Sequence, residues 1–204
     1  MTIAMTKTVC LDPGHGGSDS GALTPNKFQE QYYTLDVCKR ASEILTPYCN
    51  VIMTRDSEDE YVGLTARAEI SNRANADVFV SYHFNSAENP ADGFELFTTP
   101  QQNNSDKLAA KIWSAHRKQF PNQRDRGIKQ ATFTVISKAN APAVLVEGEF
   151  LHTVAGEAFV ESEENRQKMA HAVVDGVLAY LGLDTAPVLT LEQRVDRVEK
   201  HLGL

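Results

Sequence analysis

The sequence has few cysteines and no long apolar run. Its three cysteines, Cys10, Cys38 and Cys49, include no C-x-x-C pair, so they indicate buried reduced thiols and argue against a disulfide framework or a zinc cage. No apolar stretch approaches the roughly 20 residues that cross a bilayer, and we expect no membrane insertion. Residues 1–7 are a short segment directly before the first predicted strand, and they show none of the regions of a secretory signal peptide. We therefore expect a protein that is made in the cytoplasm.

Clusters of lysine and arginine are also missing. The 204 residues carry a formal net charge of −7 at pH 7. A basic patch is the usual electrostatic footprint of a nucleic-acid-binding protein, so nucleic acid is not an expected partner. The length suits one domain with a sizeable core, and 42% hydrophobic and 23% charged residues are ordinary for a globular protein.

Hydrophobic patterning predicts strands that alternate with helices. Apolar runs predict strands at 8–11, 51–54, 78–81, 93–98, 133–136 and 143–146. Apolar residues at helical spacing predict helices at 30–45, 64–75, 105–120 and 163–181. Ser105 is the expected N-cap of the third helix. The alternation predicts an α/β fold with a mostly parallel sheet flanked by helices, spanning residues 1–183 as one domain.

The C-terminal residues differ from this core. Residues 184–188 include a proline and are typical of a linker. Leu191, Val195, Val198 and Leu202 then follow at 4-3-4 spacing with charges between them, which predicts a short amphipathic helix over 189–204. Because a helix of this length is marginal alone, we expect it to pack on the core, to form a homo-oligomer or to be the remnant of a lost second module.

Four chemistry-bearing side chains lie where predicted elements begin or end. His15 follows the first strand on a Pro-Gly turn, His83 ends the third, Glu147 follows the run 143–146, and Glu30 opens a helix. In open α/β sheets the ligand crevice lies outside the carboxyl ends of the strands, so these residues could gather there. Two imidazoles and a carboxylate make a catalytic zinc site with an open position for water, and a second carboxylate would serve as base.

Each residue also has a simpler interpretation. His15 could be a loop histidine that bonds to backbone, His83 a strand-end histidine in the core, and Glu30 a carboxylate favoured by the helix dipole. Glu147 is harder to explain without a site, because a buried carboxylate needs a partner. The remaining histidines are typical of helix surfaces, and among them His152 could face the site. These are His116, His152, His171 and His201.

A set of motifs occurs in one order along the chain. It contains V-C-L-D-P-G-H-G-G at 9–17, R-D at 55–56, L-x-x-R at 64–67, A-D-V-F-V-S-Y-H-F-N at 76–85 and P-A-V-L-V-E at 142–147. Together these motifs resemble the zinc-dependent N-acetylmuramoyl-L-alanine amidases of the type 3 class, over about residues 7–183.

The resemblance implies a fold, a site and a reaction. The fold would be a twisted, mostly parallel six-stranded sheet flanked by helices. His15, Glu30 and His83 match the ligands of one Zn²⁺ per chain, and Glu147 matches the catalytic glutamate. The reaction would be hydrolysis of the amide between the lactoyl group of N-acetylmuramic acid and L-alanine, with peptidoglycan as the partner.

Two positions near the site add further expectations. Asn85, two residues past His83, is a candidate for orienting substrate or a ligand. The segment after Glu147 departs from the family, which more often has a small or neutral residue at Glu149 and an asparagine near His152. Glu149 is thus an extra acid close to the site, and it could point away along the strand.

Several biological settings fit such an enzyme. Without a signal peptide or wall-binding repeats, a phage-type endolysin that reaches the wall after membrane breach is the leading hypothesis. A bacterial autolysin is the alternative setting. Competing functions are a peptidoglycan-binding module with a vestigial zinc site and a zinc peptidase of the cell wall.

Overall fold

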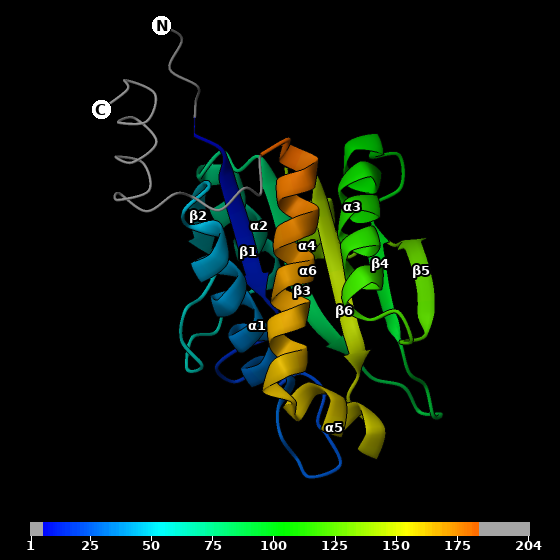
Figure 1. Cartoon of the computed structure of the whole chain (residues 1–204). Coiled ribbons are helices and arrows are strands. Elements are labelled where there is room, and N and C mark those ends of the chain that lie inside the picture. The colour runs from blue at the N-terminus through cyan, green and yellow to red at the C-terminus, as the bar shows by residue number, and fades with distance from the viewer. Residues whose placement is uncertain (1–5, 184–204) are drawn as a thin grey trace, which may run out of the picture.

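The computed structural model describes residues 6–183, which form an α/β fold (Figure 1). The strands are β1 Thr8–Pro13, β2 Asn50–Met53, β3 Val78–Asn85, β4 Phe94–Thr98, β5 Asp125–Gln130 and β6 Ala143–Phe150. The helices are α1 Glu30–Leu45, α2 Leu64–Arg73, α3 Asn103–Gln119, α4 Thr134–Ser137, α5 Val154–Glu161 and α6 Glu163–Leu181. The predicted linker 184–188 and helix 189–204 lie outside the described residues.

The strands form one six-stranded sheet in the order β2-β1-β3-β6-β4-β5. All neighbouring pairs are parallel except β4 with β6, which is antiparallel. The register aligns Pro13 with Tyr82 and His83 with Glu147. The carboxyl ends of β1, β3 and β6 therefore meet at one edge of the sheet, and the predicted mostly parallel sheet is confirmed.

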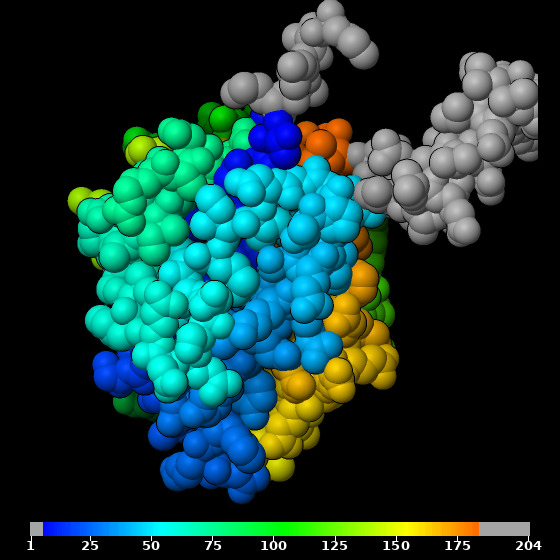
Figure 2. All heavy atoms as spheres, turned by 90° about the vertical axis from the view of Figure 1, so that its left-hand side faces the viewer, coloured from blue at the N-terminus to red at the C-terminus, as the bar shows by residue number. Residues whose placement is uncertain are grey.

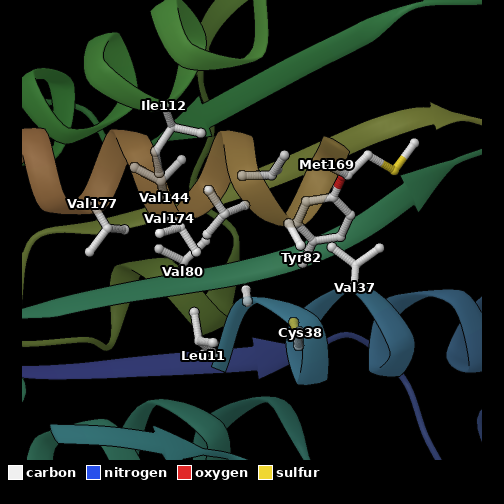
Figure 3. Packing of buried hydrophobic residues seen from close by; sticks show 14 of the residues in the cluster. Leu11, Val37, Cys38, Val80, Tyr82, Ile112, Val144, Met169, Val174 and Val177 are labelled. Atoms are coloured by element: carbon white, nitrogen blue, oxygen red, sulfur yellow. The ribbon is translucent and has the colours of Figure 1, made fainter. Parts of the chain in front are cut away.

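Each face of the sheet carries its own apolar cluster. The larger cluster packs α1, α3 and α6 against the alternate residues Val9, Leu11, Val80 and Val144, and Figure 3 shows part of it between the sheet and the helices. The smaller cluster joins the opposite face to α4. Strands covered on both faces read as continuous apolar runs, which is why 78–81 and 143–146 were predictable as strands.

Two predicted helices have the bounds that the periodicity indicates. These are α1 at 30–45 and α6 at 163–181. The Ser162 side chain caps α6 by accepting a hydrogen bond from the Asn165 amide, and Gly182 ends it with φ of 66°. Within residues 6–183, no helix combines the length and apolar character needed to cross a membrane.

The strand predicted at 133–136 is wrong, because these residues begin the short helix α4. Their β-branched and aromatic side chains favour a strand by propensity. In the structure, Val135 and Ile136 are buried in the smaller cluster, and the amide of Ser137 donates to the carbonyl of Phe133. Tertiary packing on the sheet therefore overrides the local preference.

Three further details differ from prediction. Strand β5 was not predicted, because Asp125–Gln130 is polar and lies at the sheet edge beyond β4. Helix α5 was also missed, although Thr153 caps it by accepting from the Gly156 amide. Ser105 is not an N-cap: α3 begins earlier, at Asn103, and the Ser105 hydroxyl accepts from the Ala143 amide.

His116 is buried, which corrects its predicted place on a helix surface. Its ring stacks on Phe94 at 3.9 Å and is only 1% exposed. Nε2 lies 2.7 Å from Oε1 of Gln123. Burial lowers the pKa of His116 to about 4, and the contact with Gln123 offsets this only in part.

The buried imidazole makes stability depend on pH. In the unfolded chain His116 takes up a proton near pH 6.5, but in the folded chain only near pH 4, so the free energy of unfolding falls as the pH drops between these values. The loss is about 3 kcal/mol at most. We expect His116→Gln to flatten this part of the pH profile, measured by urea unfolding of the chelator-treated protein at pH 4 to 7. Equal slopes in the two proteins would contradict the assignment.

Candidate metal centre

The structure brings His15, Glu30 and His83 together at the carboxyl edge of the sheet. His15 Nε2 lies 3.1 Å from Glu30 Oε1, and His83 Nδ1 lies 3.2 Å from both of these atoms. Ligand atoms at 2.0–2.1 Å from a tetrahedral zinc ion are about 3.3 Å apart. The three side chains therefore already have the spacing that a zinc ion requires, and two imidazoles with one carboxylate are a donor set that zinc prefers.

The turn after β1 places His15 at the centre. His15 has φ of 62°, a left-handed conformation that costs a non-glycine residue about 1–3 kcal/mol. The neighbouring Gly14 allows a close approach: a Cβ there would lie 2.2 Å from Cε1 of His83 and 2.5 Å from its Nδ1. The glycine of the Pro-Gly turn thus makes room for the second imidazole.

Backbone donors hold the Glu30 carboxylate beside the two histidines. Its Oε2 accepts from the Ala22 amide at 2.8 Å, and its Oε1 accepts from the Phe84 amide at 2.9 Å. Burial alone would raise the pKa of Glu30, but hydrogen bonds and charges of His15 and His83 outweigh it and lower the pKa to about 2. The carboxylate is therefore anionic, as a metal ligand must be.

The loop that leads into Glu30 is anchored to α5. Asn26 donates through its amide and its side chain to the carboxylate of Glu157 in α5. Figures 1 and 2 both show this loop, in blue, beside α5, in yellow, at the lower end of the molecule. Gly21 in this loop has φ of 66°, and a Cβ there would lie 2.6 Å from both Glu30 and His15.

Asp19 is a supporting residue that sequence reasoning missed. Its Oδ2 lies 3.0 Å from Nδ1 of His15, and its Oδ1 accepts from the Gly21 amide. A carboxylate on the outer nitrogen of a ligand histidine fixes the tautomer and the ring orientation. Nε2 of His15 is therefore the nitrogen that faces Glu30 and His83. The available signal was an acid four residues after a glycine-flanked histidine.

We expect Asp19→Asn to weaken zinc binding about 10- to 100-fold, because loss of such a partner has this effect in other zinc sites. Competition with a chromophoric chelator measures the affinity. Asp92→Asn is the matched control, since Asp92 is an exposed acid paired with Arg124. Unchanged affinity in Asp19→Asn would show that Asp19 does not orient the histidine.

Glu147 lies beside this cluster with one unsatisfied oxygen. It is the register partner of His83 in β6, and among the described residues its buried Oε2 has no hydrogen-bond partner. Burial raises the pKa of Glu147 well above its usual value, and the charges of Glu30 and Glu95 add to this. Buried polar atoms rarely lack a partner, so this oxygen marks a position for a group that the protein itself does not supply.

A second set of charges lies next to Glu147. Glu95 is its register partner in the antiparallel strand β4. The Oε2 atom of Glu95 accepts from Arg126 Nε at 2.7 Å and Lys129 Nζ at 2.5 Å, and its Oε1 accepts from Asn85 Nδ2 at 2.8 Å. Asn85 therefore holds Glu95 in this structure, and its role toward substrate stays a prediction.

Glu149 and His152 point away from the centre. The register between β3 and β6 shifts after His83, and Glu149 accepts from the amides of Gly93 and Phe150 and from Gln123 Nε2. His152 instead holds a neighbouring loop: its Nδ1 accepts from the Ala87 amide and its Nε2 lies 3.0 Å from the Asn89 carbonyl. The expectation that Glu149 points away is met, whereas His152 does not face the site.

Comparisons with known proteins agree on one family. The family described as N-acetylmuramoyl-L-alanine amidase matches residues 9–179. The chain is 33% identical to the amidase LytC of Bacillus subtilis over 85% of its own length and 35% of that protein. It is also 33% identical to the endolysin of Bacillus phage SPP1, over 88% of this chain and 68% of that protein. The chain thus spans about a third of the first relative and two thirds of the second.

A solved structure supports the same fold. The N-acetylmuramoyl-L-alanine amidase from Clostridium difficile 630 superposes with a TM-score of 0.84 at 33% identity. The match covers 88% of this chain and 98% of that one.

Proposed function

The chain belongs to the N-acetylmuramoyl-L-alanine amidase family, and from this premise we propose that it cleaves the amide between N-acetylmuramic acid and L-alanine in bacterial peptidoglycan. In this proposal, His15, Glu30 and His83 hold one Zn²⁺, and Glu147 is the catalytic residue. One observation carries it: three ligand atoms with zinc spacing lie next to a buried carboxylate oxygen that has no hydrogen-bond partner within residues 6–183.

The zinc site and Glu147 have different roles in the proposed hydrolysis. The chemistry that zinc supplies in such a site is to lower the pKa of a water from about 16 to about 7 and to polarise a carbonyl. Glu147 accepts the proton of the attacking water at Oε2. The new C–O bond forms first, and the C–N bond then breaks as Glu147 passes the proton to the departing alanine nitrogen. Burial and the charges of Glu30 and Glu95 raise the pKa of Glu147, so its carboxylate is a stronger base for the first of these transfers than an exposed glutamate would be.

Product analysis tests this function. Purified peptidoglycan is incubated with the protein, with and without a chelator, and the released fragments are identified by mass spectrometry. We expect stem peptides that begin with a free L-alanine amine, lost on chelation and restored by zinc. Cleavage at another bond would overturn the proposed substrate but would still support a zinc hydrolase. Binding to the wall without cleavage in excess zinc would favour a binding module.

We further propose that the protein acts on the cell wall as an endolysin-type enzyme, supported by the match to the phage SPP1 endolysin. The match to LytC makes an autolysin the alternative. Expression inside a Gram-positive host distinguishes them. An endolysin-type enzyme should lyse the cells only after the membrane is permeabilised, whereas wall damage without permeabilisation would favour an autolysin.

A further inference from the structure

Two buried arginines of the R-D and L-x-x-R motifs have no part in the proposed reaction. Arg55 and Arg67 are only 1% and 3% exposed. Arg67 donates from Nη1 to the Pro13 carbonyl at 2.5 Å and from Nη2 to the His15 carbonyl at 2.5 Å. Its Nη1 also pairs with Asp12 at 2.8 Å. The guanidinium thus spans the turn that carries His15.

Arg55 contacts the same turn as Arg67. Its Nε donates to the Pro13 carbonyl at 3.1 Å, and its Nη2 donates to the Gly14 and Gln31 carbonyls, both at 2.9 Å. Gln31 follows Glu30 in α1. Arg55 therefore bonds both the turn with the first ligand and the helix turn with the second.

Together the two guanidinium groups cover three consecutive carbonyls, those of Pro13, Gly14 and His15. Asp12 pairs with one of the two charges, that of Arg67, and it is itself fixed by the hydroxyls of Thr54 and Ser81. These bonds link the turn to Arg55, just after β2, and to Arg67 in α2, and through Arg55 they also link it to α1.

We propose that Arg55 and Arg67 are positioning residues that hold His15 in its left-handed conformation, with Nε2 facing Glu30 and His83. The inference rests on the metal centre of the proposed function. Only a guanidinium suits this task, because it offers five N–H donors in a rigid fork, whereas the donors of a lysine all radiate from one nitrogen. An Arg→Lys change keeps the charge but cannot make all the carbonyl bonds.

Zinc affinity of Arg67→Lys and Arg55→Lys tests the proposal. The control is Arg166→Lys, since Arg166 also donates to two carbonyls, of Val160 and Glu161, and pairs with Asp36. Affinity is measured by competition with a chromophoric chelator. The visible spectrum of the Co²⁺-loaded proteins reports the ligand geometry directly.

We expect at least tenfold weaker zinc binding and a changed Co²⁺ spectrum in the Arg55 and Arg67 variants. Arg166→Lys should lower the Tm but leave both metal readouts unchanged. Wild-type affinity and spectrum in the Arg55 and Arg67 variants would overturn the inference. An equal loss in Arg166→Lys would overturn it too, since the effect would then follow general destabilisation.

Thr34→Val keeps the test decisive if the arginine variants do not fold. Thr34 Oγ1 donates to the Gly14 carbonyl at 2.8 Å and accepts from Arg55 Nη2, so this change weakens the same turn without altering charge. A smaller loss of affinity supports the inference, and none contradicts it. Failure of the wild-type protein to bind zinc would instead overturn the metal centre, which separates the two proposals.

Discussion

Replacing Glu147 with glutamine is expected to lower the amidase rate by about 10²–10⁴-fold, the usual contribution of a general acid–base residue. The amide has nearly the same size, but it cannot accept the proton of water or return it to the leaving nitrogen. Because Glu147 is not among the three proposed ligands, zinc content should stay near one per chain. Release of stem peptides from peptidoglycan gives the rate, and elemental analysis gives the zinc content.

Glu149→Gln is the matched control for this change. Glu149 lies on the same strand, is 5% exposed, and has partners for its carboxylate away from the centre. We expect the Glu149 variant to lose stability while its rate stays within a few-fold of wild type. If the Glu149 variant loses the rate and the Glu147 variant keeps it, the base has been assigned to the wrong glutamate.

Gly14→Ala is expected to weaken zinc binding at least 100-fold and to lower the amidase rate to match. A Cβ at this position would overlap the His83 ring, including the Nδ1 atom that faces Glu30. Backbone geometry does not forbid alanine here, since Gly14 is not among the residues with positive φ. The expected defect is therefore displacement of one ligand. Chelator competition measures the affinity, and circular dichroism verifies the fold.

Gly63→Ala is the control for the glycine change. Among the residues that the structure describes, nothing lies within 4 Å of a Cβ placed on Gly63, which has no positive φ, so its variant should bind zinc as the wild type does. Full zinc affinity in Gly14→Ala would mean that His83 can move without losing the metal, and that the spacing of the three ligand atoms is not set by this turn.

The parts of the fold that are predictable from sequence are those with a strong apolar pattern. The helices 30–45 and 163–181 bury one face each, so their periodicity gives their bounds. Strand β5 has no such pattern, since an edge strand of polar residues is stabilised by its ladder to β4. The residues 133–136 have strand propensity, but burial of Val135 and Ile136 fixes them as a helix. Long-range packing determines the structure of both segments, and a short stretch of sequence contains no information about that packing.

The residues of the candidate site likewise fall into those that the sequence predicts and those that it does not. His15, His83 and Glu147 follow strands and Glu30 opens a helix, so topology alone predicts that they converge. The supporting residues carry no such signal. Asp19 is a half-exposed loop acid, and Glu95 approaches Glu147 only because β4 runs antiparallel to β6. Their roles depend on strand direction and loop conformation, which the sequence pattern does not reveal.

The three cysteines bear on the redox conditions that the fold tolerates. All three are buried and unpaired in the described part of the chain. Burial raises the pKa of Cys10 to about 12, and it raises the pKa values of Cys38 and Cys49 as well. Oxidation and thiol–disulfide exchange proceed through the thiolate, which these sites disfavour. We therefore expect the same fold in reducing and oxidising surroundings, with no refolding on passage from one to the other and no cross-linking through these three thiols.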